Sequence, residues 1–149
     1  MITEEQQGEY RPELYEIIEE IEKTKDIVAT LKQYGSKYSS FTDYLRCVFD
    51  KKIQFLLPDG KPPYNPSNPS SVPSTWHKKH MDLRYFVEVG GGSNERSQGK
   101  RESMFIQLLE SIHPEDAVII CKMVEKKTTT KKLTKKAVME ALPDLIKES

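Results

Sequence analysis

The chain has 149 residues, of which 36% are hydrophobic and 31% are charged, and its 23 basic residues balance its 23 acidic residues. This length fits one domain with a small core. No run of about 18 apolar residues occurs, so we expect no transmembrane helix, and the polar N-terminus does not resemble a signal peptide. Cys47 and Cys121 are too few for a disulfide scaffold. We therefore expect a reduced, intracellular and soluble protein.

The charges are distributed unevenly between the two ends of the chain. Residues 1–26 carry nine acidic and three basic side chains, whereas residues 122–136 carry seven lysines and one glutamate. Such polarity can mark an interaction surface, although exposed charge is also the ordinary state of a protein surface. The candidate partner-binding lysines of this tract are Lys126, Lys127, Lys131 and Lys132.

Residues 12–33 are predicted to form the first helix, with Pro12 in its first turn and Gly35 as its stop signal. Its apolar stripe consists of Leu14, Ile17, Ile18, Ile21, Val28 and Leu31. The stripe fills fewer than three heptads, so a coiled coil is not established. We expect residues 1–36 to form an acidic amphipathic helix that mediates self-association or partner docking through Ile21 and Val28.

Residues 37–149 are predicted to form a helical domain whose first helix begins near Ser40, with Asp43 at capping-box spacing. A proline-rich arm over residues 53–73 follows, because six of the nine prolines lie between positions 58 and 73. Tyr64 is expected to pin this arm onto the core. The arm also contains PxxP spacing, typical of SH3 ligands, but a packed loop is the favoured interpretation.

The remaining chain predicts four more helices and no convincing strand. They cover residues 74–89, which end at Gly90–Gly92, then 100–112, a segment that starts at Pro114 after His113, and a last segment from Thr134 to Pro143. Residues 100–112 carry the widest apolar stripe and are predicted to be the centre of the core. The sequence thus predicts an all-α single domain of five or six helices with a long proline-rich loop.

The side chains that could carry chemistry do not form a recognisable motif. His77 and His80 lie three residues apart, but neither His113 nor the two cysteines complete a metal-ligand spacing with them. No base stands beside either cysteine in the sequence. We therefore predict no catalytic residue, no metal, no cofactor and no enzymatic activity.

Four stretches of the sequence carry a resemblance to a known family. They are Ile53–Tyr64 (IQFLLPDGKPPY), Lys100–Ala117 (KRESMFIQLLESIHPEDA), Leu133–Lys136 (LTKK) and Ala141–Ile146 (ALPDLI). Together they resemble a family of small proteins from T-even-type tailed phages, cyanophages among them, over roughly residues 38–146. Some members of that family carry names tied to modulation of host transcription under heat shock. The resemblance brings no functional residues with it.

The leading hypothesis is a non-enzymatic phage accessory protein in the host cytoplasm that binds a host or phage protein machine. RNA polymerase and a sigma factor are the partners that the resemblance suggests. One alternative is a nucleic-acid-binding protein that uses the lysine-rich tract 122–136, although this tract lacks interleaved aromatic residues. The other alternative is a virion or assembly component that forms homo-oligomers through the first helix.

Overall fold

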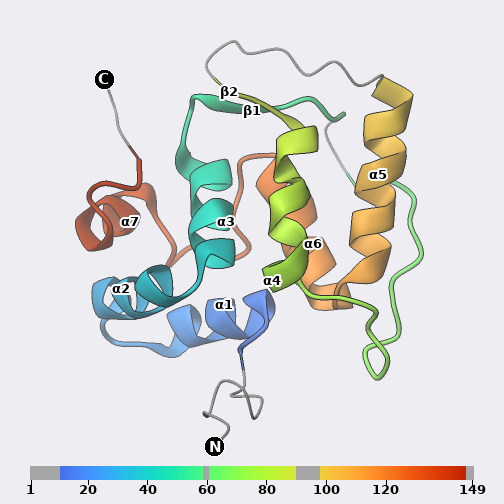
Figure 1. Cartoon of the computed structure of the whole chain (residues 1–149). Helices are drawn as coiled ribbons and strands as arrows, with labels where there is room; N and C mark the ends of the chain where they lie inside the picture. Colours follow the sequence, from blue (N-terminus) through green and yellow to red (C-terminus); the bar gives the residue numbers. More distant parts are fainter. Residues whose placement is uncertain (1–10, 59–60, 90–97, 147–149) are drawn as a thin grey trace, which may run out of the picture.

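The computed structural model describes residues 11–58, 61–89 and 98–146, which form one predominantly helical domain (Figure 1). The elements of these residues are α1 (Leu14–Lys23), α2 (Ile27–Lys37), α3 (Ser39–Phe49), β1 (Ile53–Phe55), α4 (Trp76–Lys79), the 3₁₀ helix η1 (His80–Tyr85), β2 (Val87–Val89), α5 (Gln98–Ser111), α6 (Pro114–Val124) and α7 (Lys135–Ala141). The predicted fold class is confirmed, with seven α-helices in the described ranges instead of five or six. Within those ranges no helix has both the length and the apolar character needed to span a bilayer.

The predicted first helix is wrong as a single helix, because the chain breaks between α1 and α2. The Asp26 carboxylate accepts the Ala29 N–H at 3.0 Å and caps the start of α2. The Thr24 hydroxyl oxygen accepts the Asp26 N–H at 3.1 Å, which holds the intervening turn. These short polar side chains compete with helical hydrogen bonding, so the chain changes direction here.

Gly35 does not end a helix, contrary to the prediction, because α2 continues through it to Lys37. A Cβ atom at position 35 would lie 2.7 Å from Leu142 Cδ1. The missing side chain therefore lets the segment after α7 approach α2 closely, and α2 and α7 lie side by side (Figure 1). At this position glycine serves helix packing.

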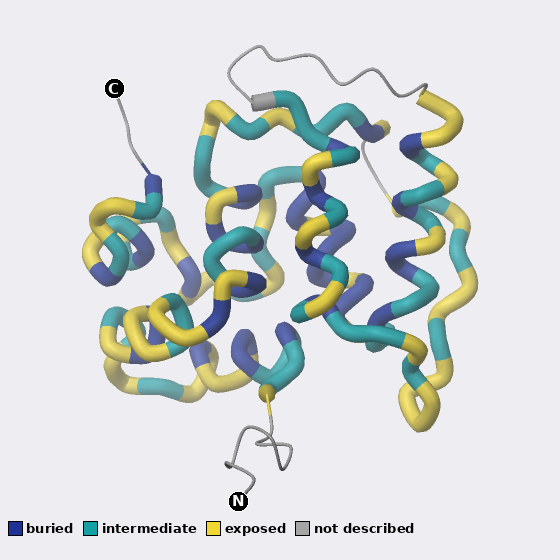
Figure 2. The backbone as a smooth tube through the Cα atoms, viewed as in Figure 1, coloured by how far each residue is buried: buried dark blue, intermediate teal, exposed yellow. Residues whose placement is uncertain are grey.

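The centre of the core is formed by α3 and α6, and the prediction that residues 100–112 form it is wrong. Helix α3 packs against α2, α4 and α6, whereas α5 lies at one side and packs on α6 (Figure 1). Both helices carry many buried residues (Figure 2), and they pack against each other. Phe105 and Leu109 of α5 are nevertheless buried in this core. Buried side chains of α1 belong to the same core, so both parts of the predicted division at residue 36 contribute to it.

The predicted helix over residues 74–89 is also wrong beyond its first turns. After α4 the chain tightens into η1 and then forms β2, which pairs antiparallel with β1, Gln54 lying opposite Glu88. Three-residue strands are too short to show alternation, and their pairing partner lies far away in the sequence. The predicted stop at Gly90–Gly92 lies outside the described residues.

The starts of the last two helices are confirmed. His113 is the N-cap of α6, where its Nδ1 atom accepts the Glu115 N–H at 3.1 Å and Pro114 occupies the first turn. The Thr134 hydroxyl oxygen accepts the Ala137 N–H at 3.2 Å and caps α7. Strong capping residues therefore predicted these boundaries correctly.

The proline-rich arm runs along α5 and is anchored to its C-terminal end. The Asn65 N–H donates to Glu110 Oε2 and the Ser74 N–H donates to the Ser111 carbonyl, both at 2.8 Å. The Ser67 hydroxyl donates to the Ile112 carbonyl. From residue 61 onward the arm contains no helix, as the proline content predicted, whereas its first residues, Ile53–Phe55, form β1. Two of the bonds use backbone carbonyls at the end of α5, and the third uses the Glu110 side chain.

Candidate functional site

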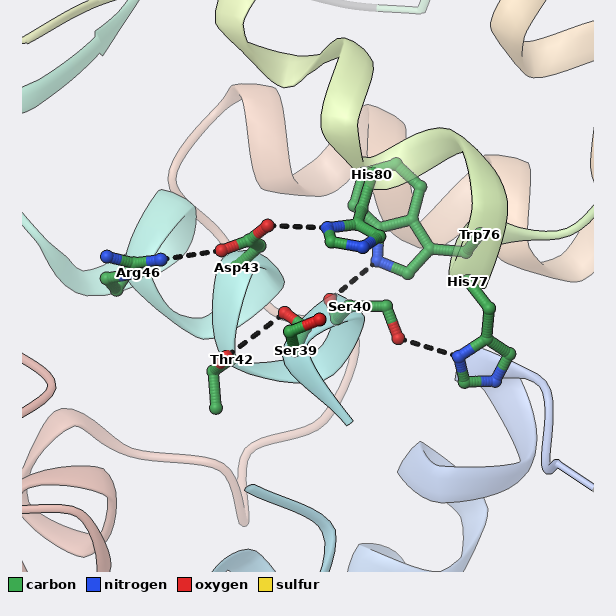
Figure 3. A network of polar contacts seen from close by, with 8 residues as sticks. All are labelled: Ser39, Ser40, Thr42, Asp43, Arg46, Trp76, His77 and His80. Atoms are coloured by element: carbon green, nitrogen blue, oxygen red, sulfur yellow. Dashed lines mark hydrogen bonds and ion pairs between the residues drawn. The ribbon is translucent and has the colours of Figure 1, made fainter. Parts of the chain in front are cut away.

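A chain of hydrogen bonds joins α3 to α4 (Figure 3) and continues from α4 to the segment before α1. Trp76 Nε1 donates to the Ser40 carbonyl at 2.8 Å, and the Ser40 hydroxyl lies 2.8 Å from His77 Nδ1. His77 Nε2 lies 2.8 Å from the Pro12 carbonyl, which can only accept, so Nε2 carries a proton. The predicted capping box is wrong, since Tyr38 is the N-cap of α3 and the Ser40 hydroxyl binds His77 instead.

A second polar group places His80 against a carboxylate of α3 (Figure 3). His80 Nδ1 lies 2.5 Å from Asp43 Oδ2, and Arg46 Nη2 lies 2.6 Å from Asp43 Oδ1. An aspartate that orients a histidine is also found around general bases. The neighbouring Cys47 thiol is no nucleophile for such a base, because burial raises its pKa to about 12. His77 and His80 lie three residues apart in the sequence, but they bind different partners. The described residues contain no group of three or more metal-ligating side chains.

The Asp43–His80 pair lies at the wall of a charged cleft of about 560 Å³ between α3, η1 and the segment after α7. Its charged lining residues are Asp43, Arg46, Asp50, Lys52, His80, Arg84 and Asp144. Met81 is 59% exposed at the same cleft. The charges of both signs lie close together, so the cleft does not favour a ligand of one charge.

A second opening of about 510 Å³, which we call the β1 groove, has a different lining. Its apolar wall consists of Val48, Phe49, Ile53, Phe55, Leu57 and Val124, and its basic residues are Lys51, Lys126 and Lys135. Gln54 and Asp50 complete it. An apolar wall with a few charged groups is typical of binding sites in proteins.

Lys126 enters the β1 groove because α6 ends in a sharp reversal. The Lys126 N–H donates to the Met123 carbonyl at 2.9 Å and the Lys127 N–H donates to the Lys122 carbonyl at 3.0 Å. This pattern is a Schellman motif, in which Lys126 takes the left-handed position usually held by glycine, with φ of 62°.

The side chain of Lys126 contacts both α3 and β1. Lys126 Nζ donates to the Asp50 carbonyl at 3.0 Å and lies 5.7 Å from the centroid of the Phe55 ring. Burial lowers the pKa of Lys126. This predicted partner-binding residue therefore lies in the β1 groove, although it also ties α6 to α3.

The other candidate lysines do not share one environment. Lys132 Nζ donates to the Glu22 carbonyl at the end of α1. Lys127 is 68% exposed and lies 3.7 Å from the Glu125 carboxylate, while Lys131 is exposed. The lysine-rich tract thus partly ties segments of the chain together. Of the four candidate lysines, Lys127 and Lys131 are exposed and their side chains bind no backbone carbonyl in the described residues.

The candidate apolar contacts of the first helix are not surface residues. Ile21 is fully buried and Val28 is half-buried in the core of the chain itself, so the predicted docking stripe is satisfied internally. A homo-oligomer through Ile21 would require α1 to leave this core. Tyr64 of the arm is half-buried against the core, as predicted, and burial raises the pKa of its hydroxyl group.

A buried carboxyl that the sequence did not reveal joins α6 to the start of α1. Asp116 Oδ1 accepts the Tyr15 N–H at 2.7 Å, while Asp116 Oδ2 is buried without a hydrogen-bond partner. Burial, and after it the negative charge of Glu13, raise the pKa of Asp116 to about 8. Sequence alone suggested only that Asp116 belonged to the acidic first turn of α6.

Comparison with known proteins adds a family but no activity. Residues 14–130 match the model of a family of unknown function, DUF6433, which covers α1 to α6 and leaves α7 outside the match. No curated protein and no solved structure matches the chain. Since the match spans most of the 149 residues, the chain belongs to the DUF6433 family.

Proposed function

We propose that the chain is a non-enzymatic phage accessory protein that binds a host or phage protein. The observation that carries this proposal is the β1 groove, whose apolar wall stands beside Lys51, Lys126 and Lys135. When a partner covers an apolar surface of this kind, the free energy falls because the surface leaves water. The lysines then select and orient the partner. The resemblance to T-even-type phage proteins supports a phage origin and action in the host cytoplasm. It also supports RNA polymerase or a sigma factor as the partner, and through it modulation of host transcription.

Nucleic-acid binding is the second candidate, and the exposure of Lys127 and Lys131 favours it. Against it stand Lys126 and Lys132, which bind backbone carbonyls of this chain. Their positive charge remains, but their side chains are not free to follow a phosphate backbone. A virion role would need self-association through the first predicted helix, and because Ile21 of that helix is buried, this role has less support.

The experiment compares capture of partners by the tagged full chain and by two charge-reversal variants during phage infection. Lys51→Glu with Lys135→Glu changes the rim of the β1 groove. Lys32→Glu with Lys78→Glu makes the same charge change at exposed positions outside the groove lining and serves as the matched control. Nuclease treatment before capture removes proteins that are held only through DNA or RNA.

We expect one protein to be enriched on the wild type and on the control, and to be lost from the groove variant. Mass spectrometry identifies it, and a polymerase subunit or a sigma factor would support the transcription role. Circular dichroism melts check that each variant stays folded. Equal capture by all three chains, or capture that disappears with nuclease, would overturn the proposal.

A further inference from the structure

Strand β1 has one edge that no strand covers in the described part of the chain, where the sheet consists of β1 and β2 alone. The Leu56 N–H donates to the Phe86 carbonyl at 2.8 Å, so Leu56 and Phe86 form a hydrogen-bonded pair that continues the pairing of the two antiparallel strands. Because hydrogen-bonded positions alternate along an antiparallel strand, Gln54 also faces β2 while Phe55 turns its N–H and C=O away from β2. The backbone of Phe55 therefore points to the open edge.

The β1 groove lies along this open edge. Ile53, Gln54 and Phe55 all line it, although successive side chains of a strand point to opposite faces of the sheet. An opening that three successive residues border must run beside the strand and not over one face of it. No residue of β2 belongs to the lining, so the groove follows the edge opposite β2.

The lining of the β1 groove offers apolar contacts beside the edge. Val48 and Phe49 come from the end of α3 and Val124 from the end of α6, while Leu57 follows β1. Val48, Leu57 and Val124 are buried, whereas Phe49 and Phe55 keep part of their surface exposed. In a strand added to β1, alternate side chains would point to the same face of the sheet, and one of these two sets can contact the apolar lining of the groove.

The charge beside the edge is positive. Among the described residues of the lining, Asp50 carries the one carboxylate, and this carboxylate accepts the Lys52 N–H at 2.9 Å. Lys126 Nζ uses one of its three donors on the Asp50 carbonyl, so two donors remain for an incoming acceptor. Together with Lys51 and Lys135 this favours carboxylates in the occupant.

We propose that the open edge of β1 binds an extended acidic peptide segment of the partner protein as a third strand. The inference rests on the proposed protein-binding function and specifies how the groove is used. Main-chain hydrogen bonds to Phe55 hold the segment, its apolar side chains enter the groove, and its carboxylates meet Lys51, Lys126 and Lys135.

The experiment measures binding of a fluorescent peptide of alternating valine and glutamate to the purified full chain by anisotropy. A second peptide of the same sequence carries N-methyl groups on alternate amides, which block ladder hydrogen bonds without changing charge. We expect the N-methyl peptide and the Lys51→Glu/Lys135→Glu variant each to weaken binding at least about tenfold, because ladder bonds and charge both contribute. The Lys32→Glu/Lys78→Glu control is expected to bind like the wild type.

A second measurement follows the Phe55 amide by hydrogen exchange, which we expect to slow when the unmethylated peptide binds. Equal binding of the two peptides, absence of peptide binding, or an unchanged Phe55 exchange rate would overturn the inference. So would an oligothymidylate probe that binds the wild type more tightly than the acidic peptide does, since this points to nucleic acid. If groove-dependent capture of a protein persists while the acidic peptide fails, the proposed function stands and only the strand-addition mode is refuted.

Discussion

Asp116 links the stability of the chain to pH, and Asp116→Asn is the substitution that isolates this link. The carboxyl is completely buried, and its unpartnered Oδ2 atom makes the ionised form costly inside the protein. Burial and the charge of Glu13 raise its pKa to about 8. In the unfolded chain, by contrast, an aspartate has a pKa of about 3.9.

Between these two pKa values the folded state holds a proton that the unfolded state has released. The free energy of unfolding therefore falls as the pH rises through this window, because the folded state binds more protons than the unfolded state. The contribution is complete below the unfolded pKa and is lost as the pH approaches the folded pKa. One proton limits the slope to about 1.4 kcal/mol per pH unit, or about 2.7 kcal/mol between pH 5 and pH 7.

We expect Asp116→Asn to remove this slope and to keep the hydrogen bond, because an amide oxygen can also accept the Tyr15 N–H. Urea unfolding at pH 5, 6 and 7 measures the effect, and the difference from the wild type cancels the histidine titrations that both chains share. Asp144→Asn, at an exposed position, is the matched control and should run parallel to the wild type. A slope that is the same in the wild type and in Asp116→Asn would refute the reasoning.

Three further outcomes follow from the packing. Ile21→Ala should lower the free energy of unfolding by about 2–5 kcal/mol, since the side chain is fully buried. Val118→Ala, at a position that is 45% exposed, should change it by less than about 0.5 kcal/mol in the same urea melts. Gly35→Ala should gain less than the about 1 kcal/mol that helix propensity offers, because the end of the Leu142 side chain must move away from the new Cβ atom. The gain should be larger in a Leu142→Ala background, and equal gains in the two backgrounds would contradict the close approach. A chelator should leave the melting temperature unchanged, and a drop that zinc restores would reveal a metal site.

Local signals in the sequence predicted the elements that depend on local structure. The starts of α6 and α7 follow from Pro114 and Thr134, whose preferences for the first turn and the N-cap act within a few residues. The break after α1 was visible only as the polar pair Thr24 and Asp26, which an otherwise regular apolar stripe outweighed. The apolar stripe predicted the buried face of α1 correctly, but it did not identify the elements that cover this face. In a sequence, a stripe that packs in the protein's own core looks the same as a stripe that binds another protein.

The candidate site depends on contacts between distant parts of the sequence. Asp43 and His80 are 37 residues apart, and Lys126 and the Asp50 carbonyl are 76 apart. Neither spacing is a motif, so periodicity and charge could not pair these groups. The role of Phe55 could not be predicted from the sequence either, because it depends on which residues of β1 form hydrogen bonds with β2. The sequence singled out Lys126 through its charge, while its role beside β1 requires the reversal that ends α6.

The close approach of α7 to α2 at Gly35 has a consequence for how the chain is made. Because α2 ends at Lys37 and α7 begins only at Lys135, the face of α2 around Gly35 stays uncovered on the ribosome until α7 has been synthesised. Contacts between such distant segments form late and slow the final step of folding. Until α7 emerges, the nascent chain exposes a face of α2 that chaperones or other nascent chains can contact. Closure of the domain therefore has to wait for the synthesis of α7.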